Sequence, residues 1–301
     1  MSESIRPSEQ RSPKQFGLKR VFAVMTVVGI MFGIVHWIGP GPTLVCFIIV
    51  LVSAAAYTLP VRKPDKWVAA ITGGVLSSGL IVTLLLPAVQ SARTPARRSQ
   101  RSNNLKQIGL GLQVYADVHG CFPPAYVADD NGRPMHSWRV LILPYIEQKV
   151  LFDQYDFAEP WDGPHNRLLA NQTPICYRCP SDAPWPGVTT SYLAVAGEET
   201  IWPATGGTAW SQFCDGTSNT IAVVEVAGSG INWMEPRDLP FSALKKGVNS
   251  TSGLGVSSRH ANAASVLFCD GHTSTIDATI PIGTLEALCT RSGNETIVGD
   301  Y

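Results

Sequence analysis

Long apolar stretches alternate with short polar breaks over the first third of the chain. The stretches are Val21–Ile38, Thr43–Leu59 and Trp67–Val89, and no charged residue occurs between Val21 and Leu59. Each stretch comes near the ~20 residues that a helix needs to cross a hydrocarbon core. The pattern predicts three transmembrane helices at about residues 21–38, 43–59 and 67–89. The alternative is a cleaved signal peptide followed by a buried core, but no small-residue cleavage site follows the first stretch.

Lysine and arginine in the short polar segments predict the orientation of these helices. The tail of residues 1–20 and the segment Pro60–Lys66 each contain several, whereas Trp37–Thr43 contains none. Cytoplasmic segments carry such an excess. We therefore expect the tail in the cytoplasm and everything after Val89 outside it. A group of arginines just past Val89 favours the opposite orientation, or contact with anionic headgroups: Arg93, Arg97, Arg98 and Arg101.

Residues 90–118 continue the third apolar stretch with a helical pattern. Apolar residues recur at spacings of three, four and three, which gives one apolar face: Leu105, Ile108, Leu112 and Tyr115. Gly109 and Gly111 either weaken this helix or allow close packing. Two prolines, at positions 123 and 124, end it near His119. A juxtamembrane helix is therefore expected, continuous with the third span.

Beyond Pro180 the pattern changes to short apolar runs divided by Gly, Asp and Asn, which favours β-strands. The clearest hairpin signal is "ASVLFCDGHTSTI". There Ala264, Val266 and Phe268 alternate before Asp270-Gly271, a pair that suits a two-residue turn with positive φ. A long helix followed by strands indicates an α+β protein.

The charge balance excludes one class of function, and the cysteine count permits disulfides. Lys plus Arg number 23 and Asp plus Glu number 23, which argues against a nucleic-acid-binding protein, because such a protein normally carries a basic surplus. Six of the seven cysteines lie in the C-terminal part, and the seventh is Cys46. An even number permits three disulfides in an oxidising compartment, with no pairing determined.

Several blocks along the chain are similar to one bacterial family. "LLLPAVQSAR", "NNLKQIGLGL" and "FPPA" are followed in order by "SWRVLILPYIEQ", "LFDQYDFAEPWDGPHN", "CPSD" and "DGTSNTI". The closing block places His260 nine residues before Asp270-Gly271. With these blocks the chain resembles the pseudopilin-like proteins of domain of unknown function 1559, whose closing signature is associated with prepilin-type processing.

The resemblance implies a fold like that of type II secretion pseudopilins. The expected fold class is α+β, with N-terminal transmembrane helices, the third continuing as a long spine helix packed on a small antiparallel β-sheet domain. The expected organisation is a cytoplasmic tail (1–20), three transmembrane helices (21–89), a spine helix (90–118) and an extracytoplasmic domain (119–301). The expected location is the bacterial inner membrane.

The chain departs from the family at its N-terminus. Members usually begin with a prepilin leader, in which the cleaved glycine is followed by Phe and, five residues on, by Glu. Here Gly17 is followed by Leu18, and Phe22 takes the place of the glutamate. Leader processing and N-terminal assembly into a fibre are therefore not expected. Arg101 also lies where many members have a cysteine.

Cys176 and Cys179, in "CYRCPSD", are candidates for half a zinc site or a redox pair. Zinc requires further ligands at suitable spacing, and a redox pair normally opens a helix. The following Pro180 indicates a turn instead. A structural disulfide, between these two or to another cysteine, is the preferred interpretation, and no metal or other cofactor is predicted.

The signature residues His260, Asp270 and Gly271 suggest a catalytic base with an orienting carboxylate, but no nucleophile motif accompanies them. The turn geometry of Asp-Gly gives a structural explanation, so no enzyme activity is predicted. In "DGTSNTIAVVE", oxygen ligands for calcium are conceivable at Asp215, Asn219 and Glu225, without EF-hand spacing. Turn and cap roles are the preferred interpretation of these residues.

The sequence therefore favours a non-enzymatic, membrane-anchored envelope protein with a pseudopilin-like ectodomain. Its expected partners are the lipid bilayer and envelope or secretion-apparatus proteins of a type II secretion or pilus-like system, with no nucleic acid. The alternative is an extracytoplasmic solute-binding protein, which the label of the family also suggests. Its pocket would be lined by aromatic residues: Trp138, Tyr155, Phe157 and Trp161.

Overall fold

The structure is a computed structural model that describes residues 95–182, 187–204, 206–250, 253–259, 262–293 and 295. The chain divides into two compact units, Met1–Ser91 and Ala92–Tyr301, and all described residues belong to the second. The membrane spans and cytoplasmic tail predicted from the sequence lie outside the described residues, as does His260.

The first described element is a straight helix over residues 95–119, called the spine helix below. One face of it is buried, at the helical spacing that the sequence shows: Leu105, Ile108, Leu112 and Ala116. The helix ends where Gly120 adopts a positive φ of 78° and its N–H bonds the Ala116 carbonyl at 2.8 Å. The predicted end near His119 is thus confirmed. The predicted apolar face is confirmed at Leu105, Ile108 and Leu112, while its fourth residue, Tyr115, is half-buried against the same core.

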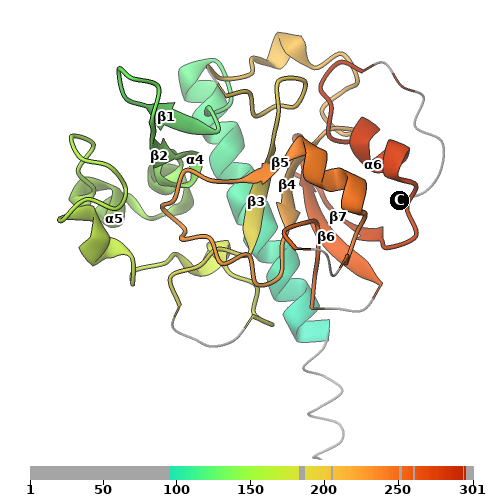
Figure 1. The fold of residues 1–301 in the computed structure, drawn as a ribbon, viewed down its shortest axis with the longest axis horizontal. Helices are drawn as coiled ribbons and strands as arrows, with labels where there is room; N and C mark the ends of the chain where they lie inside the picture. The colour runs from blue at the N-terminus through green and yellow to red at the C-terminus, as the bar shows by residue number, and fades with distance from the viewer. Residues whose placement is uncertain are drawn as a thin grey trace, which may run out of the picture. The chain divides into compact units, whose positions relative to one another are not determined.

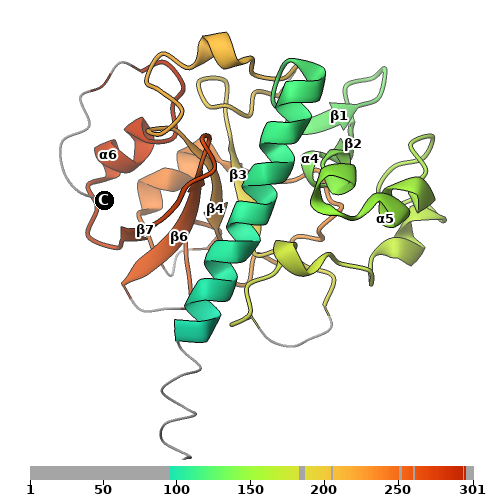
Figure 2. The same cartoon turned by 180° about the vertical axis from the view of Figure 1, so that it is seen from behind.

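A five-stranded sheet lies against the buried face of the spine helix (Figure 1, Figure 2). Its strand order is β5-β3-β4-β6-β7. The strands are β3 (Tyr192–Ala196), β4 (Ile221–Glu225), β5 (Leu239–Pro240), β6 (Ala263–Phe268) and β7 (Thr273–Asp277). All neighbours pair antiparallel except β3 and β5, which pair parallel. The sheet is therefore mixed at one edge.

Each face of the sheet contributes to a separate core, because alternate strand residues point to opposite sides. Tyr192 and Ala194 of β3 pack with the spine helix. Leu193 and Val195 belong to the other core, which also contains residues of α6 (Ile282–Ala287) and of the 3-10 helix Phe241–Lys246. The sheet is thus covered on both faces.

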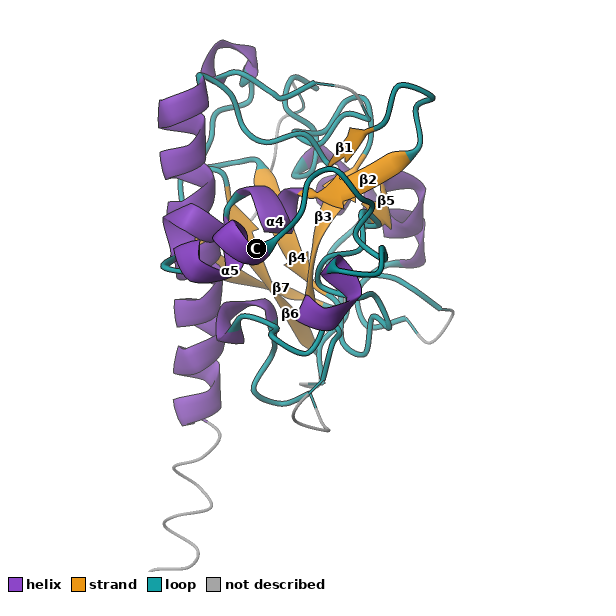
Figure 3. Cartoon of the chain, turned by 90° about the vertical axis from the view of Figure 1, so that its left-hand side faces the viewer, coloured by secondary structure: helices purple, strands orange, loops and turns teal. Residues whose placement is uncertain are grey.

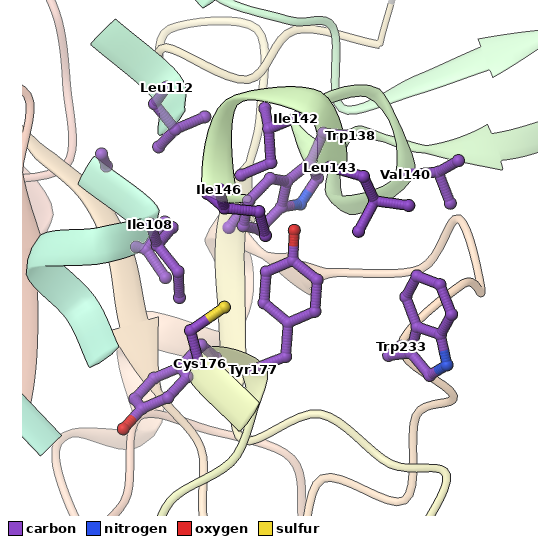
Figure 4. Packing of buried hydrophobic residues seen from close by; sticks show 14 of the residues in the cluster. Ile108, Leu112, Trp138, Val140, Ile142, Leu143, Ile146, Cys176, Tyr177 and Trp233 are labelled. Atoms are coloured by element: carbon purple, nitrogen blue, oxygen red, sulfur yellow. The ribbon is translucent and has the colours of Figure 1, made fainter. Parts of the chain in front are cut away.

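Between the spine helix and β3 the chain forms short elements around the helix-side core. These are the two-stranded hairpin β1 (Tyr126–Ala128) and β2 (Pro134–Ser137), the helices α4 (Trp138–Leu141) and α5 (Lys149–Gln154), and 3-10 turns at Leu143–Ile146, Asn166–Leu169 and Ile175–Tyr177; a further 3-10 turn, Trp210–Gln212, follows β3. Figure 4 shows Ile108 and Leu112 of the spine facing Trp138, Ile146 and Tyr177. A short apolar segment such as "SWRVLILPYI" thus completes the core that the spine begins.

The predicted fold class is wrong as a whole, and only its α+β character holds. Across the residues that the structure describes, no helix has both the length and the apolar character required to span a bilayer. The sheet is also not purely antiparallel, because the two-residue strand β5 joins β3 in parallel. The sequence pattern gave no sign of so short an edge strand.

Candidate functional site

The outward face of the spine helix exposes apolar side chains to solvent. Figure 3 places the helix at the edge of the molecule, with the sheet on one side of it only. Leu110 is 57% exposed and Val118 is 63% exposed, while Val114 between them is half-buried. The spacing of four residues puts the three side chains in one stripe. We call Leu110, Val114 and Val118 the outer stripe.

The β6–β7 hairpin fastens the spine helix to the sheet. Its contacts run along the helix from Ser102, whose hydroxyl lies 2.8 Å from the Thr273 hydroxyl, to Gln113, whose Nε2 donates to the Cys269 carbonyl at 3.3 Å. Between them, Gly109 packs against Gly271 and Leu267. The outer stripe is therefore carried by a helix that is held along most of its length.

A buried ion pair joins the spine helix to β4. Arg101 Nη1 lies 3.3 Å from Glu225 Oε2, and both side chains are almost fully buried. Arg101 also donates to the Ser258 hydroxyl at 3.1 Å, and Glu225 Oε2 accepts the Ser265 N–H at 3.1 Å. The paired charges join the N-terminal part of the described helix to β4, although Arg101 Nε and Glu225 Oε1 have no hydrogen-bond partner among the described residues.

A second buried ion pair, Arg139 with Asp238, joins α4 to the sheet. The Asp238 carboxylate accepts hydrogen bonds from the Arg139 guanidinium, from Trp138 Nε1 at 3.1 Å and from Ala194 N at 2.8 Å. Burial raises the pKa of this carboxyl to about 6, against the opposing effect of the Arg139 charge. Arg139 further donates to backbone carbonyls, including that of Tyr192 at 3.3 Å. The pair holds the "SWR" block in place.

Cys176 and Cys179 are both buried and carry free thiols in the structure. Cys176 lies in the helix-side core beside Tyr177 (Figure 4). Burial raises the pKa of the Cys176 thiol to about 12. Burial, and after it the charge of Glu225, raises the pKa of the Cys179 thiol to about 12. Buried thiols of this kind are poor nucleophiles. A disulfide between them stays a prediction.

The signature residues Asp270 and Gly271 lie in the β6–β7 turn. Gly271 has a φ of 88°, and the Gly271 N–H bonds the Phe268 carbonyl at 3.0 Å. Asp270 Oδ1 accepts from the backbone N–H of His272 at 3.0 Å and lies 2.6 Å from His272 Nδ1. The predicted hairpin is confirmed. Its turn is longer than two residues, and only Gly271 takes a positive φ.

The conceivable calcium ligands are not brought together. Asp215 Oδ2 accepts the Gly293 N–H at 2.7 Å, and Asn219 Nδ2 donates to the Asp215 carbonyl at 3.1 Å. Glu225 stands at the far end of β4, about 13 Å from Ile221 at ~3.3 Å per residue, and is neutralised by Arg101. Within the described ranges, no group of three or more His, Cys, Asp or Glu could hold a metal ion.

The four aromatic residues proposed for a solute pocket do not surround one cavity. Trp138 is fully buried, Tyr155 nearly so, and Trp161 packs against the core. Phe157 is 39% exposed. An open hollow of about 490 Å³ lies beside α5, and of the four only Tyr155 lines it: Asp153, Gln154, Tyr155, Asp156, His165, Leu168 and Leu169. The solute-binding alternative is therefore not favoured.

Sequence reasoning missed the two buried ion pairs and the outer stripe. The sequence did contain a signal for the Arg139–Asp238 pair. Arg139 interrupts an apolar run in "SWRVLILP", and a charge there requires a buried partner. Its partner Asp238 lies 99 residues away and carries no local mark. The sequence shows Leu110 and Val118, but nothing in its pattern indicates that their side chains lie on the exposed face of the helix.

The family comparison agrees with the sequence blocks. Residues 90–210 match the family model described as "Protein of unknown function (DUF1559)", a range that includes the spine helix, α4, α5 and β3. The description of this family model does not mention pseudopilins, so the resemblance to pseudopilins stays a prediction. Neither a curated protein nor a solved structure matches the chain. The part of the chain over residues 90–210 is thus similar to the DUF1559 family.

Proposed function

We propose that the chain is a non-enzymatic protein of the bacterial envelope that acts by protein–protein contact through the outer stripe. The observation that carries the proposal is the exposure of Leu110 and Val118 on a helix fixed along its opposite face. Single exposed apolar residues are common on protein surfaces. Two exposed apolar residues with the half-buried Val114 between them, at spacings of four on one helix, form the pattern by which helices dock onto partners.

The rigid mounting of the helix supports an interaction role. A partner that binds a preformed surface loses less conformational freedom than one that must order it. Here Gly111 brings the spine close to Ile146 on one flank, while Gly109 does the same with Leu267 on the other. The helix therefore presents the outer stripe without needing to fold on binding.

The envelope placement is supported by the sequence of the preceding residues, 21–89, which is almost continuously apolar. The resemblance of the sequence blocks to pseudopilin-like proteins supports partners in a type II secretion or pilus-like apparatus. Asp270 has no catalytic role in this proposal, because its carboxylate is engaged by His272 within the same turn.

Photo-crosslinking in cells tests the proposal. A p-benzoylphenylalanine at position 110 or 118 of the full chain should capture protein partners on illumination. The matched control is position 130, where Asp130 is exposed in the β1–β2 loop, away from the stripe. Equal capture at positions 110, 118 and 130, or none at any of them, would overturn the proposal.

A further inference from the structure

Three buried polar atoms near the N-terminal part of the spine helix have no hydrogen-bond partner among the described residues: Arg101 Nε, Glu225 Oε1 and Tyr192 OH. All three side chains are more than nine-tenths buried, so bulk solvent does not satisfy them. A buried polar atom without a partner is costly, and most such atoms in folded proteins are paired with protein or with an ordered water. These three atoms therefore require a further hydrogen-bonding group in the interior.

The three side chains come from different elements that meet at this place. Arg101 belongs to the spine helix, Tyr192 is the first residue of β3, and Glu225 is the last residue of β4. Tyr192 and Glu225 stand directly opposite each other in the antiparallel β3–β4 pair, so their side chains share one face of the sheet. That face lies against the spine helix (Figure 2), from which Arg101 Nη1 reaches Glu225 Oε2 at 3.3 Å.

The other neighbours of the Tyr192 hydroxyl do not supply the hydrogen bond. Burial raises the pKa of this phenol well above its ordinary value, and the next contributions come from Cys179 and Glu225. Arg101 acts in the opposite direction, as does Asn104, so all four side chains are close to Tyr192. Asn104 Nδ2 already donates to two backbone carbonyls, the nearer at 2.8 Å. The Cys179 thiol is only a weak donor.

We infer that one water molecule is bound between Arg101, Glu225 and Tyr192 and joins the spine helix to β3 and β4. The bound group must accept a hydrogen bond from Arg101 Nε–H and donate one to Glu225 Oε1, while the Tyr192 hydroxyl can do either. Water meets all three requirements at once. A cation cannot accept from the guanidinium, and an anion cannot donate to the carboxylate. The paired charges of Arg101 and Glu225 also leave no net charge to attract either kind of ion.

The bound water lies where the spine helix leaves the core. Arg101 is the first buried residue of the described helix, and residues 95–100 before it are exposed. The water therefore completes the first interior contact of the helix, together with the Arg101–Glu225 pair. This inference goes beyond the proposed function and does not depend on the outer stripe, because it concerns the side of the helix that faces the sheet.

Nuclear magnetic resonance of the full chain, purified in detergent and isotope-labelled at its arginine nitrogens, tests the inference. The Arg101 Nε–H should show a rotating-frame cross-peak to water with the sign of a through-space contact rather than that of chemical exchange. Arg101→Lys identifies this signal by removing it. The matched control is Arg139, which is equally buried but whose Nε donates to the Tyr192 carbonyl at 3.3 Å. The Arg139 Nε–H should show no such cross-peak.

Tyr192→Phe separates a bound water from the tyrosine hydroxyl, whose own proton can carry the same signal. The Arg101 cross-peak should persist in this variant, because the water keeps Arg101 and Glu225 as partners. No cross-peak in the unaltered chain, its loss in Tyr192→Phe, or an equal cross-peak at Arg139 would overturn the inference.

A crystal structure of the unaltered full chain gives a second measurement, which does not depend on the folding of a variant. One solvent peak should lie within about 3.2 Å of Arg101 Nε, Glu225 Oε1 and Tyr192 OH. A protein atom in that place, or direct hydrogen bonds among these three atoms, would refute the bound water.

Discussion

Gly109 of the spine helix and Gly271 of the β6–β7 turn meet backbone to backbone. A Cβ built on Gly109 would lie 3.3 Å from Gly271 Cα and 2.9 Å from Leu267 Cδ1. A Cβ on Gly271 would lie 3.0 Å from the Gln113 amide, at a φ of 88°. The Asp270-Gly271 pair thus marks the place where a turn approaches a helix closely, which is a structural role.

Replacing Gly271 by Ala should destabilise the chain more than the same change at Gly132. Both residues have positive φ, 88° and 80°, so the conformational strain of about 1–2 kcal/mol is shared. Gly132 has no atom within 4 Å of the added Cβ, whereas Gly271 meets Gln113. Urea unfolding of the two variants measures the difference. Equal costs would show that the turn does not pack on the helix.

Breaking the Arg101–Glu225 pair should be costly, and removing both charges should not. Glu225→Met leaves the Arg101 guanidinium buried without its carboxylate, and Arg101→Met leaves the carboxylate buried without its guanidinium. Each change typically costs about 3–5 kcal/mol. Arg101→Met/Glu225→Met replaces the pair by side chains that can pack, and should cost much less than the sum of the single changes. A double-mutant cycle on the free energy of unfolding checks this. Additive effects would contradict the pairing.

Asp238 should make stability depend on pH in the direction opposite to a usual carboxylate. Its pKa is raised from 3.8 to about 6 in the folded chain. The folded state therefore binds more protons between about pH 4 and pH 6, and its stability falls as the pH rises through that range. The change from this group is on the order of 3 kcal/mol.

Comparison with Asp238→Asn isolates this effect, because the amide does not titrate there and other groups cancel in the difference. The unaltered chain should exceed the variant in stability by more at pH 4.5 than at pH 7.5. Denaturant unfolding at the two pH values measures both. An excess that grows with pH would mean that Arg139 holds the pKa of Asp238 below its ordinary value.

Asn166 should stabilise the loop of residues 156–166, which follows α5. Its Nδ2 donates to the carbonyls of Asp156, Glu159 and Pro160, and its Oδ1 accepts the Asp156 N–H at 2.9 Å. Asn166→Ala leaves several buried partners unsatisfied, at about 1–3 kcal/mol each for those that water does not reach. Faster proteolytic cleavage within residues 156–166 is the expected readout.

The matched control is Asn171→Ala, because Asn171 is exposed five residues further on. That variant should be cleaved at the rate of the unaltered chain. If Asn166→Ala shows no faster cleavage than the control, the loop is held by its aromatic contacts rather than by the amide.

The elements that the sequence predicted correctly are those with a local hydrophobic periodicity. The apolar face of the spine helix and the β6–β7 hairpin were predictable, because residues such as Leu105, Ile108 and Val266 recur at the spacing of one helix face or one strand face. The partners of buried charges were not, because Arg139–Asp238 and Arg101–Glu225 are 99 and 124 residues apart. Only tertiary packing places such side chains together.

The same limit explains why the structure does not support the calcium and solute-pocket hypotheses. Asp215 and Glu225 are close in sequence, but β4 carries Glu225 away and turns its side chain to the spine helix. Trp138 and Trp161 are both apolar rings near a loop, yet each packs into the core rather than into a shared cavity. Proximity in sequence does not determine which face of an element a side chain takes.

The contact between Gly109 and Gly271 also determines when the spine helix can be completed during synthesis. About 160 residues separate the two positions, which is on the order of 10–30 s of translation at ~5–20 residues per second. Until β6 and β7 emerge, the core around Leu105, Ile108 and Leu112 lacks Leu267 and Cys269, so the nascent chain leaves this helix face incompletely covered for that interval. Folding chaperones are expected to bind there, and a chain shortened before β6 should remain bound to them.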